Sequence, residues 1–159
     1  MGRPFNRDAY NACDQSSKQR LVQIIEKNTK YKLACDLNEE MYKKGDVVFK
    51  YNDKEIICEN EVRYDFYKIA YRYNTIHIPI RKKCTQSNCY FVWNTDLTEC
   101  IFIDSKLIKE YSDNVVTLTC KHEMSKKTEY VDSFIDIPKN KTTWLKINDD
   151  LTWSKVNYK

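Results

Sequence analysis

Residues 46–63 read Asp46-Val47-Val48-Phe49-Lys50-Tyr51-Asn52-Asp53-Lys54-Glu55-Ile56-Ile57-Cys58-Glu59-Asn60-Glu61-Val62-Arg63. Two runs rich in β-branched and aromatic residues flank the turn pair Asn52-Asp53, which predicts an antiparallel hairpin. A two-residue turn pairs Tyr51 with Lys54, and the same register places Asp46 directly opposite Glu59. The stretch therefore predicts a β-sheet whose first hairpin carries acidic residues at its open end.

Three carboxylates are expected to gather there. Side chains alternate between the two faces of a strand, so Glu59 and Glu61 share one face, and Asp46 lies opposite Glu59. Carboxylates this close repel one another, and a bound divalent cation relieves the repulsion. Mg²⁺ commonly takes two carboxylates together with water and phosphate oxygens, which suits phosphodiester cleavage. In the alternative interpretation, Asp46 begins a strand at the solvent rim, and Glu59 and Glu61 simply face water.

Around this hairpin the chain alternates between helical and strand patterns. The first is a helix over residues 16–28, in which Leu21, Ile24 and Ile25 share one face. The other expected elements are a short strand over 31–35, a helix over 63–73, a strand over 75–81, a second hairpin formed by 89–93 and 99–103, a short helix over 105–111, and strands over 115–120, 130–137 and 144–147. This order predicts an α+β or mixed α/β fold around a sheet, with a change of character near residue 110.

Composition sets the broad class. A chain of 159 residues with 42% hydrophobic and 13% aromatic content suits one folded domain, residues 1–159. The net charge of +4 permits nucleic-acid binding without arguing for it. No apolar run reaches the roughly 20 residues of a membrane-spanning helix, and none follows the N-terminus as in a secretory signal. The expected location is therefore the cytoplasm, or the interior of a host cell if the protein is viral. A viral origin is considered because the residue usage indicates an AT-rich coding sequence, as in many phages, viruses and some bacteria.

The acidic hairpin also carries a family resemblance. The order helix–strand–strand–helix–strand, with Asp46 on the first hairpin strand and Glu59-Asn60-Glu61 on the second, resembles the PD-(D/E)xK nuclease superfamily. The signature of that family is an Asp, a long gap, and then Asp/Glu-x-Lys. The resemblance covers about residues 16–104. It implies a restriction-endonuclease-like core, with a central mixed β-sheet flanked by helices, and leaves a β-rich C-terminal extension over about 110–159.

The resemblance implies a metal-dependent endonuclease that hydrolyses DNA with Mg²⁺ or Mn²⁺. Asp46 and Glu59 would bind the ion, with the backbone carbonyl of Asn60 as a further ligand, and Glu61 would orient the attacking water. Glu61 stands where the family usually has Lys, although some active members carry Glu there. A competing alignment takes Glu61 as the acid and Arg63 as the basic residue, which would act only electrostatically because arginine does not readily give up a proton.

Two smaller points follow from the same resemblance. Gly45 stands where the family usually has Pro. Many members use a Glu on the leading helix, for which Glu26 is the candidate here, and otherwise Glu26 is a solvated helix residue. Such enzymes often dimerise to cut both strands, so a homodimer is also expected.

Basic residues near the hairpin are candidate contacts for the DNA backbone. Arg63 is one of them, and the expected helix after it interleaves Lys68 and Arg72 with tyrosines, which suits phosphate contacts and stacking on unpaired bases. The triplet Arg81-Lys82-Lys83 ends the following strand. The alternative is that these tyrosines pack in the core and the charges are solvated. The second functional hypothesis is a non-enzymatic module with a degenerate nuclease fold, which would bind nucleic acid or protein and could be encoded by a phage.

The seven cysteines are scattered and are interpreted as reduced thiols. A zinc site could be built from Cys84, Cys89 and Cys100, or could include Cys120 and His122, but the paired Cys-x2-Cys motifs of strong zinc sites are absent. With only two glycines, phosphate-cradling loops are nearly excluded.

Overall fold

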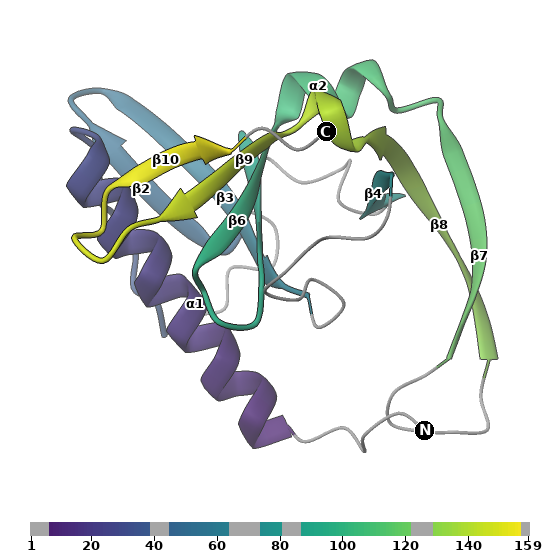
Figure 1. Ribbon diagram of the computed structural model, residues 1–159, viewed down its shortest axis with the longest axis horizontal. Coiled ribbons are helices and arrows are strands. Elements are labelled where there is room, and N and C mark those ends of the chain that lie inside the picture. The colour runs from purple at the N-terminus through teal and green to yellow at the C-terminus, as the bar shows by residue number, and fades with distance from the viewer. Residues whose placement is uncertain (1–6, 39–44, 64–73, 81–86, 122–128, 157–159) are drawn as a thin grey trace.

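A computed structural model of the chain describes residues 7–38, 45–63, 74–80, 87–121 and 129–156. It contains two α-helices, a short 3₁₀ helix and ten strands among these residues (Figure 1). In chain order they are α1 (Arg7–Asn28), β1 (Lys32–Leu33), β2 (Val47–Tyr51), β3 (Lys54–Val62), β4 (Thr75–Pro79), β5 (Cys89–Trp93), β6 (Glu99–Asp104), α2 (Ser105–Glu110), β7 (Val115–Lys121), β8 (Glu129–Pro138), η2 (Lys139–Lys141), β9 (Thr143–Ile147) and β10 (Trp153–Val156).

Seven strands form one mixed sheet in the order β1-β2-β3-β5-β6-β9-β10. Neighbouring strands are antiparallel except β3 and β5, which run parallel. The first hairpin is therefore not at an edge, because β3 lies between β2 and β5. The strands β9 and β10 come from the region after residue 110 and complete the far side of this sheet.

Helix α1 covers one face of the sheet. Its apolar stripe of Leu21, Ile24 and Ile25 packs against inward-facing residues of β2, β3, β5, β6 and β9. The stripe predicted for residues 16–28 is thus confirmed, and the helix begins nine residues earlier, at Arg7. The last turn is fixed by Asn28, whose Nδ2 donates to the carbonyl of Leu151 at 2.9 Å and so ties α1 to the turn before β10.

A second sheet of three strands, in the order β4-β8-β7, lies against the other face of the main sheet. Ile76 and Ile78 of β4 and Ile135 and Ile137 of β8 are fully buried there. They pack against Tyr90, Val92, Ile101, Ile103 and Trp144 of the main sheet. Within the described ranges this face is covered mainly by β4 and β8, with Leu107 and Ile108 of α2 also packed against it, whereas the resemblance implied a sheet flanked by helices.

The α+β class with a central mixed sheet is confirmed. Both predicted hairpins are present, and strands predicted over 75–81, 115–120, 130–137 and 144–147 correspond to β4, β7, β8 and β9. Strand β10 was not predicted, and the helix expected over 63–73 falls almost wholly outside the described residues. No helix in the described part of the chain is long and apolar enough to cross a membrane.

Candidate functional site

The first hairpin has the predicted register. Tyr51 pairs with Lys54, and Val47 pairs with Cys58 at the open end. The turn is the expected two residues, with Asn52 at φ 53°, a conformation that asparagine tolerates better than most residues. The paired register ends there: the Asp46 backbone N–H donates to the Cys58 carbonyl at 2.8 Å, so Asp46 lies beside Cys58 and does not form the predicted pair directly opposite Glu59.

The chain needs glycine immediately before Asp46. Gly45 has φ +96°, and a Cβ at that position would lie 2.8 Å from a side-chain carbon of Ile57 and 3.1 Å from the Cys58 carbonyl oxygen. A non-glycine residue would therefore be strained and would also collide with β3. This close approach explains why glycine precedes the acidic residue.

Glu59 is the most buried of the three predicted carboxylates. Its residue surface is 2% exposed, and the Ser87 hydroxyl donates to its Oε1 at 3.0 Å. By strand alternation it shares the face of Ile57, which is the face away from α1. The interpretation of Glu59 as a solvated strand residue is therefore wrong.

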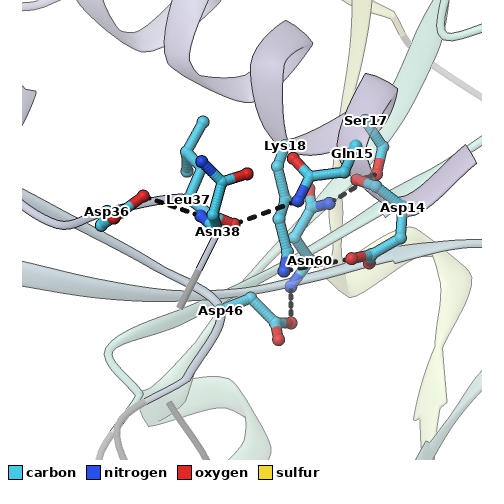
Figure 2. Close-up of polar contacts among 9 residues, drawn as sticks. All are labelled: Asp14, Gln15, Ser17, Lys18, Asp36, Leu37, Asn38, Asp46 and Asn60. Atoms are coloured by element: carbon cyan, nitrogen blue, oxygen red, sulfur yellow. Dashed lines mark hydrogen bonds and ion pairs between the residues drawn. The ribbon is translucent and has the colours of Figure 1, made fainter. Parts of the chain in front are cut away.

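Asp46 is positioned by the backbone of β3. The Asn60 N–H donates to Asp46 Oδ2 at 2.8 Å, and this bond is drawn in Figure 2. The N–H and carbonyl of one strand residue point to the same side of the strand, so the Asn60 carbonyl also faces the end of β2 where Asp46 lies.

Glu61 is engaged differently from the other two acids. Arg63 Nε donates to its Oε1 at 2.5 Å, and the Tyr90 hydroxyl donates to its Oε2. Burial of the ring, together with the negative charge of Glu61, raises the pKa of Tyr90 well above its usual value. A second guanidinium nitrogen of Arg63 donates to the His77 carbonyl, which links the main sheet to β4. Arg63 was predicted to contact DNA, and here its guanidinium is engaged within the protein.

The three acids consequently have three different sets of donors. Across the described ranges, no group of three His, Cys, Asp or Glu side chains is placed to hold a metal ion. The chemistry of the donor set nevertheless fits a Mg²⁺ site of the common type, which uses one or two carboxylates and completes its shell with water and phosphate oxygens. Asp46 and Glu59 are the two predicted carboxylate ligands, and Glu61 accepts a hydrogen bond on each of its oxygens.

The sequence did not predict the polar network that anchors this site. Asn60 Nδ2 donates to Ser17 Oγ, and Trp93 Nε1 donates to Asn60 Oδ1, each at 2.8 Å. Ser17 in turn donates to the Asp14 carbonyl within α1 (Figure 2). Ser17 is fully buried, and Asn60 is 5% exposed. The sequence did contain a sign that Ser17 is buried, because Ser17 lies four residues before Leu21 and so extends the buried stripe of α1.

Glu26 does not join this cluster. It lies nine residues after Ser17, which on an α-helix is about 13 Å along the axis and two and a half turns away, on the opposite side. The helix acid nearest to the network is instead Asp14, which forms an ion pair with Lys18 at 3.1 Å (Figure 2). The remaining candidates for DNA contact, Lys68, Arg72, Arg81, Lys82 and Lys83, lie outside the described residues.

Five cysteines are described with their side chains and form no disulfide: Cys13, Cys35, Cys58, Cys89 and Cys100. Cys58 and Cys89 are a directly opposed pair on β3 and β5, with their Sγ atoms 3.3 Å apart. This contact, reinforced by burial, raises the pKa of Cys58, and burial raises that of Cys100. Cys84 and His122, which were needed for the predicted zinc sites, lie outside the described residues.

Searches with protein-family models, against curated proteins and against solved structures find no significant match for this chain. Function is therefore inferred from the hairpin and its contacts alone.

Proposed function

We propose that this chain is a metal-dependent endonuclease that hydrolyses DNA phosphodiester bonds on a restriction-endonuclease-like core of the PD-(D/E)xK type. The observation that carries the proposal is that Asp46 is hydrogen-bonded to Cys58 and to Asn60, the two residues that flank the buried Glu59 on β3. The order of α1, β2 and β3, and a later strand, β5, parallel to β3, also support it. One element departs from the family order, because β4 joins the second sheet.

In this proposal Asp46 and Glu59 supply carboxylate oxygens to Mg²⁺ or Mn²⁺. The ion, when bound, activates water and stabilises charge on the phosphoryl oxygens. The Asn60 N–H fixes the Asp46 carboxylate, and the Ser87 hydroxyl fixes that of Glu59. Donors of this kind hold metal-binding carboxylates in one orientation and commonly affect metal affinity.

Glu61 enters the proposal as the group that orients the attacking water. Each of its oxygens accepts one hydrogen bond and retains a further lone pair for that contact. The Arg63 guanidinium beside it balances its charge, so Glu61 does not add to the repulsion between Asp46 and Glu59.

The test is a plasmid-nicking assay on the purified chain with Mg²⁺, with Mn²⁺ and with EDTA. We expect nicking that requires metal and that falls by about 100-fold in Asp46→Asn and in Glu59→Gln, a loss of about 2.7 kcal/mol of transition-state stabilisation. The matched control is Asp53→Asn, an exposed acid in the turn of the same hairpin, which should cleave like the wild type. Metal-dependent cleavage that survives both substitutions in folded protein would refute the assignment.

The second candidate is a non-enzymatic module that binds nucleic acid or protein. The observation that favours it is Glu61, which stands in place of the usual Lys and is engaged by Arg63 and Tyr90. A binding module would cleave no duplex, single-stranded, branched or RNA substrate with either metal, and Asp46→Asn would leave its metal affinity unchanged.

A further inference from the structure

Two thiols face each other across the parallel strands β3 and β5. Cys58 and Cys89 are directly opposed, and their Sγ atoms lie 3.3 Å apart without a covalent bond. Adjacent strands lie about 4.8 Å apart, which is within the range of about 4.4–6.8 Å between Cα atoms that a disulfide spans. The two side chains therefore have the spacing from which a disulfide can form with little movement of either strand.

Cys100 is the contrasting case in the same core cluster. It is fully buried, but the residues paired with it on the neighbouring strands are Trp93 and Leu145. Burial in the core therefore does not distinguish Cys58 and Cys89 from Cys100. What distinguishes them is that each has a second thiol opposite it in the register of the sheet.

We propose that Cys58 and Cys89 are an oxidation site, at which a peroxide closes an intramolecular disulfide between β3 and β5. In the first step the peroxide converts one thiol to a sulfenic acid and releases water. In the second step the other sulfur attacks that sulfenic acid, forms the S–S bond and displaces the hydroxyl group, which leaves as water with the second thiol proton. Overall the two thiols lose two electrons and two protons, and hydrogen peroxide is reduced to two molecules of water.

Cys89 is the thiol that is oxidised first. It is 6% exposed and follows the exposed Asn88 at the start of β5, whereas Cys58 is 1% exposed. The hydrogen bond from the Cys89 thiol and burial both raise the pKa of Cys58, which therefore stays protonated, and a thiol in that form is the weaker nucleophile. Cys89 thus takes the oxidant, and Cys58 resolves the sulfenic acid.

The cross-link would lie beside the contacts that hold the two buried-end acids. The Cys58 carbonyl accepts from the Asp46 N–H, and Glu59, the next residue, accepts from Ser87, two residues before Cys89. Closing the bond shortens the Sγ–Sγ distance from 3.3 Å to about 2.0 Å and restricts the unfolded chain. We therefore expect the oxidised protein to resist urea better than the reduced protein.

The first test treats the native full chain with hydrogen peroxide at about pH 8, removes the peroxide with catalase and blocks the remaining thiols by alkylation in denaturant. After digestion with trypsin and chymotrypsin, mass spectrometry should find a disulfide that joins peptide 55–63 to peptide 84–90 and that dithiothreitol removes. The link should be absent in Cys58→Ala and in Cys89→Ala. It should persist in Cys100→Ala, the matched buried control, and in Cys84→Ala, because peptide 84–90 also contains Cys84. No such link in the wild type, or a link that needs Cys84 instead of Cys89, would overturn the proposal.

The second test needs no variant to fold. Urea unfolding of the wild type should show a higher midpoint after peroxide treatment, and dithiothreitol should return it to the starting value. An unchanged or lowered midpoint would overturn the proposal. The order of the two steps is tested with a 1,3-dione that traps sulfenic acids: it should label Cys89 in peroxide-treated Cys58→Ala, and labelling of Cys58 in Cys89→Ala would overturn that order. Neither test uses metal or DNA, so its outcome is separate from that of the nuclease proposal.

Discussion

The buried side chain of Asn60 makes a strong stability prediction. Replacing it with alanine removes the acceptor of the Trp93 indole N–H and the donor to Ser17 Oγ, each bonded at 2.8 Å. The hydrogen bond from the Asn60 backbone N–H to Asp46 is left in place. Asn60→Ala therefore separates the anchoring of β3 to α1 from the positioning of the acidic residue.

The magnitude follows from burial. Trp93 is fully buried, so its N–H cannot find water, and an unsatisfied buried donor costs about 1–3 kcal/mol. The space left by the amide adds a cavity cost, which brings the expected loss to about 2–4 kcal/mol in the free energy of unfolding. For a chain of this length, about 3 kcal/mol lowers Tm by roughly 6–12 °C.

The assay is urea unfolding followed by tryptophan fluorescence, for Asn60→Ala, Ser17→Ala and the double variant. The Asn60–Ser17 hydrogen bond is lost in both single variants, so the double variant should be less destabilised than their sum by about 1 kcal/mol. Asn38→Ala, at an exposed position after β1, is the surface control and should stay within about 0.5 kcal/mol of the wild type. A loss below about 0.5 kcal/mol for Asn60→Ala, or strict additivity, would refute the reasoning.

Three further predictions concern the same region. Gly45→Ala should destabilise the fold by about 1–3 kcal/mol in urea unfolding, because its backbone has φ +96° and the new Cβ would meet β3; a neutral effect would contradict the close approach. Burial and the negative charge of Glu61 raise the pKa of the Tyr90 hydroxyl in the folded protein above 10.0, the value in the unfolded chain. The contribution of Tyr90 to the free energy of unfolding is therefore complete below pH 10 and is lost as the pH rises above 10. Between pH 10 and 11 the wild type should lose about 1 kcal/mol more than Tyr90→Phe, and parallel curves would contradict this. The buried thiols of Cys58 and Cys100 have raised pKa values, so at about pH 8 they should react with a thiol reagent only when the protein unfolds. The partly exposed thiol of Cys35 should react in the native protein. Mass spectrometry of the labelled peptides would distinguish the two outcomes.

The local features were predictable because short-range chemistry determines them. A two-residue turn at Asn52-Asp53 leaves one register for the hairpin, and that register is confirmed. The second hairpin, β5 with β6, was equally visible as two apolar runs around a polar turn. In both cases the residues that decide the pairing are adjacent in the sequence.

Partners that are distant in sequence could not be predicted in the same way. Strand β4 has the expected β pattern, but nothing local indicates that it pairs with β8, from Thr75↔Pro138 to Pro79↔Phe134, rather than with β3. Strand β10 is short, and Trp153-Ser154-Lys155-Val156 has neither alternation nor a continuous apolar run. Its pairing with β9 depends on the turn that Asn28 anchors from α1.

Charge at the site shows how much a local pattern can determine. Glu61 and Arg63 are two residues apart in the strand predicted from the sequence, so alternation alone places them on the same face within reach of each other, although β3 itself ends at Val62. Their ion pair was therefore implied by the sequence, although Arg63 was interpreted as a DNA contact. The burial of Glu59 was not implied, because it depends on Ser87 and on how segments far along the chain cover that face. The most buried of the three carboxylates is thus the one whose environment only the folded chain could specify, while the neighbouring acid is neutralised by a residue already present in the same strand pattern.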